Sequence, residues 1–183
     1  MANLVRMRTA RWVAALAAAV LAVVLSACVP TPAPTPTTTG FASEEEAFAA
    51  AEATYRAYVD ALNDVDLSDP ATFEPVFALS TDPLLGLDRT TLSQYHAEDV
   101  TFVGASKVTL LAPIQWNPAS GIATLATCLD VSAIDVLDRN GSSLVTEGRS
   151  DIQPQAVSLT TSGSTNFAVA EIHGRDGEPT CSG

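Results

Sequence analysis

The chain has 183 residues, with 9 Lys and Arg against 21 Asp and Glu, and a formal net charge of −12. This length fits one compact domain with appended segments, and 47% hydrophobic residues suffice for a core. The acidity argues against DNA or RNA as a partner, because binding phosphates needs clustered Lys and Arg. It also argues against electrostatic attachment to anionic lipids.

Residues 1–27 are predicted to be a secretory signal peptide. Three arginines are the only charged residues before Glu44, and an uninterrupted apolar run of 14 residues follows them at 12–25. This run is shorter than the about 20 residues that a membrane-spanning helix needs. A basic start and a short apolar middle are typical of export signals, and a buried N-terminal helix is the alternative.

The end of the apolar run carries the motif Leu25-Ser26-Ala27-Cys28. This motif resembles the lipobox of bacterial lipoproteins. The resemblance implies cleavage before Cys28, attachment of diacylglycerol to its thiol, and anchoring at the extracytoplasmic face of the cell membrane. Two acyl chains anchor stably where one binds only marginally. The cleaved chain keeps six basic residues against 21 acidic ones, a formal charge of −15.

The chain has three cysteines, an odd count. If Cys28 carries lipid, Cys128 and Cys181 remain as an even pair in an oxidising compartment, which favours a disulfide. Two separate thiols are the alternative. A bridge would connect the C-terminal tail to a central strand.

The chain divides into three parts. After the signal peptide, residues 28–40 hold the lipidated cysteine and a Pro/Thr-rich stalk of sequence VPTPAPTPTTTG, which favours polyproline II. A flexible linker is the alternative for this stalk. Residues 41–183 form a single domain.

The first half of this domain is predicted to be helical. Ser43 and Glu46 form a capping box, and apolar residues then recur at helical spacing from Glu44 to about Asn63. A short helix follows from 69–70 to about 79, with a proline at 75 that fits its first turn or restarts it. A third helix is expected from about 88 to 98.

After residue 99 the apolar period changes to that of strands. Val100, Phe102, Val108, Leu110 and Ala112 are expected on one side of an extended segment that bends near Gly104. A second strand covers 122–136, with a kink near 130–132, and further strands cover 155–161 and 166–173. Helices followed by strands predict an α+β fold with N-terminal helices packed on a curved antiparallel sheet.

This order of elements resembles the NTF2-like fold. The resemblance rests on the long first helix (FASEEEAFAAAEATYRAYVDALNDVD), two shorter helices (FEPVFAL and LDRTTLSQYHAED) and the strands VTFVGASKVTLLAP and IATLATCLDVSAIDVLDRNG. The chain is also similar to small exported lipoproteins of high-GC Gram-positive bacteria. The resemblance implies a cone whose sheet and helices enclose a pocket, which serves catalysis in some members and only binding or dimerisation in many.

Motifs for catalysis, metals or nucleotides are missing from the sequence. It has no HExxH, CxxC, G-x-S-x-G or phosphate-binding glycine motif, so no cofactor and no metal site are predicted. Asp64, Asp66 and Asp69 crowd one turn, but Asp69 stands where an EF-hand loop needs glycine, and a solvated polar turn explains them better.

The cone suggests a set of candidate pocket residues: Tyr55, Tyr58, Tyr95, His96, Trp116 and Asp130. A buried Asp130 with a raised pKa would act as a base beside a tyrosine that donates a hydrogen bond. The structural alternatives are an aromatic core, a helix-end histidine and a strand-edge carboxylate, and they are favoured over catalysis.

The sequence therefore predicts a lipid-anchored extracytoplasmic protein whose NTF2-like domain binds a small molecule or a protein without catalysis. One alternative is an enzyme of the isomerase or dehydratase kind that uses the cone pocket. Another is an accessory envelope or transport lipoprotein that acts through its outer sheet face. A homodimer is a further expectation from the resemblance.

Overall fold

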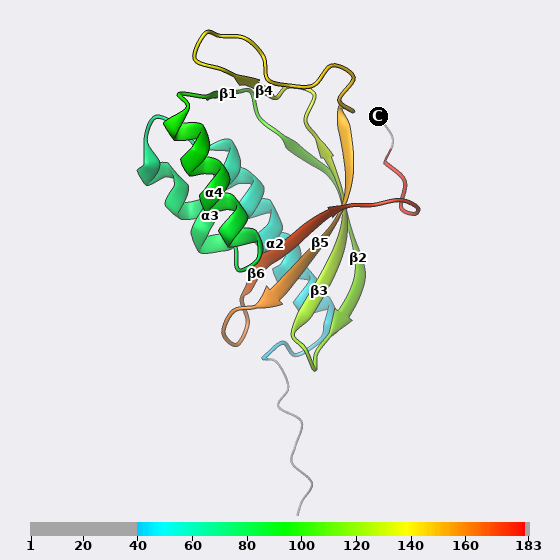
Figure 1. The fold of residues 1–183 in the computed structure, drawn as a ribbon. Coiled ribbons are helices and arrows are strands. Elements are labelled where there is room, and N and C mark those ends of the chain that lie inside the picture. Colours follow the sequence, from blue (N-terminus) through cyan, green and yellow to red (C-terminus); the bar gives the residue numbers. More distant parts are fainter. Residues whose placement is uncertain (1–39, 182–183) are drawn as a thin grey trace, which may run out of the picture. The chain divides into compact units, whose positions relative to one another are not determined.

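The computed structural model describes residues 40–181, so the predicted signal peptide, Cys28 and almost all of the stalk lie outside the described residues. Helices come first and strands follow (Figure 1). The elements are α2 (Glu44–Asn63), the 3₁₀ helix η1 (Pro70–Phe73), α3 (Glu74–Leu79), α4 (Leu84–Ala97), β1 (Thr101–Val103), β2 (Lys107–Asn117), β3 (Ile122–Asp130), β4 (Asp135–Leu137), β5 (Ile152–Thr161) and β6 (Phe167–Gly174). None of the described helices is long and apolar enough to cross a membrane.

Helix α2 starts with the predicted capping box. The Ser43 hydroxyl accepts a hydrogen bond from the Glu46 backbone at 3.1 Å. The Glu46 carboxylate reaches back to the Ala42 backbone N–H at 2.7 Å. The first bond satisfies the Glu46 N–H, which the helix leaves without a partner, and the second fixes the residue just before the N-cap.

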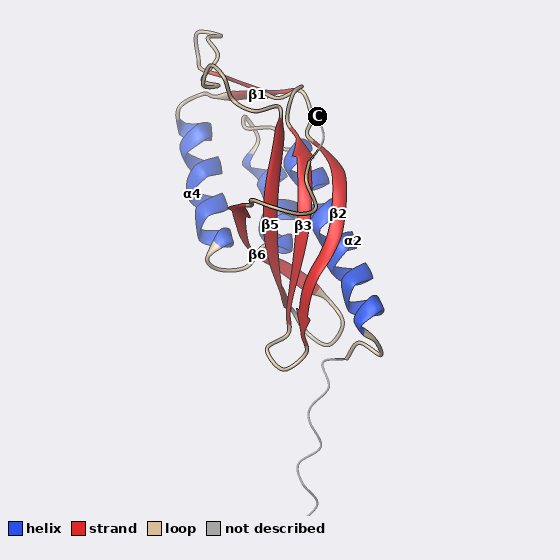
Figure 2. Ribbon diagram, turned by 90° about the vertical axis from the view of Figure 1, so that its right-hand side faces the viewer, coloured by secondary structure: helices blue, strands red, loops and turns tan. Residues whose placement is uncertain are grey.

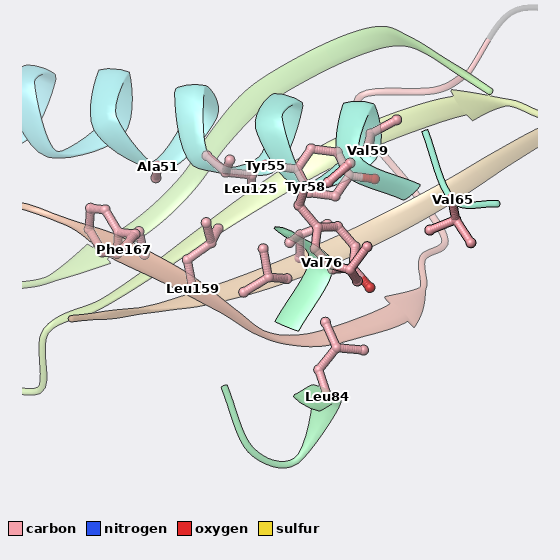
Figure 3. Close-up of a cluster of buried hydrophobic side chains, with 14 of the residues drawn as sticks. Ala51, Tyr55, Tyr58, Val59, Val65, Val76, Leu84, Leu125, Leu159 and Phe167 are labelled. Atoms are coloured by element: carbon pink, nitrogen blue, oxygen red, sulfur yellow. The ribbon is translucent and has the colours of Figure 1, made fainter. Parts of the chain in front are cut away.

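Strands β2, β3, β5 and β6 form one antiparallel sheet in that order. The helices cover one face of this sheet (Figures 1 and 2). The α+β class, with N-terminal helices packed on an antiparallel sheet, is therefore confirmed. Between the layers, α2 contributes Ala51, Tyr55 and Tyr58, which meet sheet residues such as Leu125 and Leu159 (Figure 3).

The first predicted extended segment is two strands. Gly104 has φ +84°, and a Cβ at this position would overlap the Ala133 carbonyl oxygen, so glycine is needed where the chain bends. Before the bend, β1 pairs with β4 in a separate two-stranded sheet. After it, a bulge between Val108 and Leu110 changes the register. Leu111 therefore packs on the core in place of Leu110, and the predicted single apolar side is wrong beyond Val108.

Helix α4 begins at Leu84, four residues before the predicted start at Asp88. The reason is that the buried spacing extends back by one turn, since Leu84, Asp88 and Leu92 are all buried at intervals of four residues. Asp88 is thus an interior residue of the helix and not its first one.

Cys128 on β3 and Cys181 in the C-terminal tail form a disulfide, with a Cα–Cα distance of 5.7 Å. Since β5 separates β6 from β3 in the sheet, the tail must cross β5 to reach Cys128 (Figure 2). Arg175 holds the start of this tail by donating to the carbonyls of Gly177 and Pro179 at 2.8 and 2.6 Å.

Candidate functional site

A hollow of about 550 Å³ lies beside the C-terminal end of α4 and the start of β1. Its walls come from the loop after α2, the last turn of α4 and the strand β1. The lining residues are Val65, Asp66, Leu67, Ser68, His96, Asp99, Val100, Thr101 and Phe102. Of the six predicted pocket residues, only His96 lines this hollow.

The orientation of His96 is fixed by the loop opposite. Its Nδ1 lies 2.7 Å from the Leu67 carbonyl oxygen, and the ring packs edge-on against Phe73 at 6.4 Å between centroids. Because a carbonyl oxygen can only accept, Nδ1 carries the hydrogen, and Nε2 is the nitrogen left for a further partner.

Two carboxylates give the hollow a negative potential. Asp66 accepts hydrogen bonds from the Ser68 hydroxyl and backbone N–H at 2.7 and 2.9 Å. These bonds hold the pKa of Asp66 below its usual range, so it is ionised at neutral pH. Asp99 lines the same hollow, and the described lining includes no Lys or Arg. The site therefore favours a cationic ligand.

The three crowded aspartates of the predicted polar turn serve the local backbone. Asp66 closes a turn onto Ser68, and the Asp69 carboxylate caps η1 by accepting from the Ala71 N–H at 3.0 Å. Residues 40–181 contain no group of three or more His, Cys, Asp or Glu side chains arranged to hold a metal ion.

Tyr55 and Tyr58 point into the core between α2 and the sheet (Figure 3). The Tyr55 hydroxyl donates to the Gln155 side-chain oxygen at 3.0 Å, and burial raises the pKa of Tyr55 to about 12. The Tyr58 hydroxyl donates to Asp88 at 3.0 Å, and burial together with the negative charge of Asp88 raises the pKa of Tyr58. Both tyrosines are tied to neighbouring elements and do not line the hollow.

Tyr95 and Trp116 lie in separate parts of the aromatic packing. Tyr95 meets Phe102 edge-on at 5.7 Å between centroids. Trp116 meets Phe41 and Phe167 edge-on at 5.9 and 5.6 Å. These contacts match the structural alternative, an aromatic core.

Asp130 is not the predicted buried base. It lies at the end of β3, half-buried, and accepts a hydrogen bond from the Ser132 backbone N–H at 2.9 Å. The hydrogen bonds from Ser132 hold the pKa of Asp130 below its usual range, so the expected raised pKa is wrong. A carboxylate stabilised by hydrogen bonds is a poor base.

The residue with the predicted properties is Asp88, which the sequence reading missed. Asp88 is 9% exposed, and burial raises its pKa, an effect that the hydrogen bond from Tyr58 only partly offsets. The signal for it was present: an acidic residue stands midway between Leu84 and Leu92 at helical spacing. Placing the helix start at Asp88 hid this pattern.

No family model and no curated protein matches the chain. Among solved structures, a protein from Catenulispora acidiphila in complex with S-DNPA is 11% identical, covers 69% of this chain and 90% of its own, and has a TM-score of 0.44. A crystal structure of a protein from Novosphingobium aromaticivorans, provisionally described as an aromatic ring hydroxylase, is 11% identical. The match covers 74% of this chain and 96% of that protein, with a TM-score of 0.45. Similarity at this level carries no conclusion about function.

Proposed function

We propose that this chain is an extracytoplasmic lipoprotein, anchored through Cys28, whose domain binds a cationic ligand in the hollow beside β1 without transforming it. The observation that carries the binding role is the hollow itself, whose lining includes the oriented ring of His96 and two acidic residues, Asp66 and Asp99. The Cys128–Cys181 disulfide supports export, because such bonds persist in oxidising compartments.

The anchor is tested by Cys28→Ala in cells that export the protein. The variant should lose labelling by a fatty-acid probe and leave the membrane fraction. Cys181→Ala is the matched control, because it also replaces a cysteine with alanine but leaves the lipobox intact. Membrane association of the Cys28 variant equal to that of the unchanged protein would contradict the anchor.

Binding is tested by thermal shift with a panel of small amines, including lysinamide, choline and putrescine, against matched carboxylic acids. The amines should stabilise the protein and the acids should not. Ser68→Trp fills the hollow and should abolish the shift, whereas Ser93→Trp places the same side chain on an exposed position of α4 and should preserve it. A shift that survives Ser68→Trp would place the ligand elsewhere.

The enzyme alternative has one observation in its favour, the carboxylate of Asp88 with its raised pKa beside the Tyr58 hydroxyl. This pair is enclosed between α2 and α4, and Asp88 does not line the hollow beside β1. Mass analysis of each stabilising amine after long incubation separates the two functions. An unchanged amine agrees with binding, and a converted one contradicts the non-catalytic role.

A further inference from the structure

Strand β1 forms part of the wall of the hollow, through Thr101 and Phe102, and has one unpaired edge. Its ladder pairs it with β4 alone. The Val136 carbonyl accepts from the Leu144 N–H on the far side of β4, so Thr101 and Val103 are the residues of β1 that face β4. Phe102 therefore directs its backbone N–H and C=O to the unpaired edge, where neither makes a hydrogen bond within the described part of the chain. Unpaired strand edges are templates onto which an extended peptide adds as a further strand.

The position of β1 is fixed at both ends. The Val100 N–H donates to the Tyr95 carbonyl at 3.0 Å. Beyond the strand, the Asn63 side chain accepts from the Ser106 N–H at 2.9 Å and donates to the Ser106 carbonyl at 3.0 Å. A strand that is already ordered loses little conformational entropy of its own when a peptide binds.

The chemistry beside this edge favours a basic and partly apolar partner. Asp66 and Asp99 supply negative charge, and Nε2 of His96 is free to accept a hydrogen bond. Val103 is 45% exposed on β1, which gives an added strand an apolar neighbour. Side chains alternate along a strand, so every second residue of an added peptide points to the same face.

We propose that the ligand of the hollow is an extended peptide segment that adds to β1 as a strand and places a Lys or Arg side chain between Asp66 and Asp99. This inference rests on the proposed function, since it names the ligand class of the same site. The edge supplies directional backbone partners that a small amine cannot use, and the carboxylates select the charged side chain.

The test is a positional-scanning library of capped hexapeptides, in which each position is fixed in turn and the others are varied. Binding is measured by fluorescence anisotropy at low salt. Lys or Arg at one position should bind about tenfold more tightly than Glu there. Methylation of alternate backbone nitrogens in the best peptide should weaken binding by a similar factor. Peptide binding should also slow hydrogen exchange of the Phe102 amide, which faces the unpaired edge.

Two double variants of the protein distinguish the effect of charge in the hollow from a general effect of losing two negative charges. Asp66→Asn with Asp99→Asn should erase the preference for Lys over Glu. The control variant, Asp60→Asn with Asp176→Asn, also removes two negative charges, but at positions outside the hollow. It should keep the preference for Lys over Glu. No preference for a basic residue, or equal binding of the methylated peptide, would overturn the inference. If lysinamide binds and no peptide does, the inference fails while the proposed function stands, and if neither binds, both fail.

Discussion

The hydroxyl of Tyr58 lies 3.0 Å from one carboxylate oxygen of Asp88 and 3.2 Å from the other. The two side chains come from α2 and α4, and their exposed fractions are 2% and 9%. A buried polar group is tolerated when its partner is present and costly when the partner is removed. This pair therefore links the two helices and makes each side chain depend on the other.

Removing the Tyr58 hydroxyl should destabilise the domain. In Tyr58→Phe the buried Asp88 carboxyl loses its donor, and we expect a loss of about 1–3 kcal/mol in the free energy of unfolding by urea denaturation. Tyr95→Phe is the matched control: the Tyr95 hydroxyl has no hydrogen bond within the described structure, so the same change should cost less there. Equal losses in both variants would show that the Tyr58–Asp88 bond contributes nothing of its own.

The contribution of Asp88 to the stability of the domain should fall as the pH rises and its carboxyl ionises. Burial raises its folded-state pKa above the value near pH 4 of an unfolded chain. Its contribution to stability is thus complete below about pH 4 and is lost as the pH rises through the folded-state pKa. Asp88→Asn cannot titrate, so its stability relative to the unchanged protein should improve from about pH 3 to about pH 7.

Asp66 is a control for which the pH dependence of stability should have the opposite sign to that of Asp88. Hydrogen bonds from Ser68 lower its folded-state pKa, so its contribution is present above about pH 4 and is lost as the pH falls. Asp66→Asn should therefore lose stability, relative to the unchanged protein, toward neutral pH. Urea denaturation at several pH values measures both trends, and a common sign for the two variants would contradict these assignments.

The sequence predicts elements whose signals are local. The capping box at Ser43 and Glu46 and the period of the following apolar residues lie within a few turns, and α2 has the predicted bounds. The split of β1 from β2 depends on the close approach of Gly104 to Ala133, which are far apart in the chain. The glycine itself predicts a bend, but no local pattern predicts its contact with Ala133 or the pairing of β1 with β4.

The candidate site was harder to predict for the same reason. His96 lines the hollow, as a pocket residue would, but the loop that orients it through Leu67 is 29 residues away. Asp130 was expected to be buried as a residue of the cone pocket, within a strand that covers 122–136. The strand ends at Asp130 instead, and Ser132 in the following turn provides hydrogen bonds to its carboxylate. Contacts between elements that are distant in the chain therefore determine that Asp88, and not Asp130, is the buried acidic residue.

Substitution at Gly104 should test the bend that separates β1 from β2. Gly104→Ala forces a Cβ at φ +84° onto the Ala133 carbonyl, so the cost combines backbone strain with steric overlap. Gly141→Ala is the matched control, because its φ is +80° and a Cβ there meets nothing within 4 Å. The control should lose about 1 kcal/mol from strain alone, and Gly104→Ala clearly more. Similar unfolding free energies for both variants would contradict the close approach.

Loss of the disulfide should be the largest of these effects. The Cys128–Cys181 bond closes a loop of 53 residues, and the chain-entropy model gives about 4 kcal/mol of stabilisation for that length. Cys181→Ser changes only the tail residue and leaves the buried Cys128 in β3. Reductant should lower the unfolding free energy of the unchanged protein to that of the variant and leave the variant unaffected. Because the tail crosses β5 to reach β3, hydrogen exchange of residues 175–180 should also quicken in Cys181→Ser, while that of α2 stays protected. Slow exchange of the tail in the variant would show that the Arg175 hydrogen bonds hold it without the disulfide.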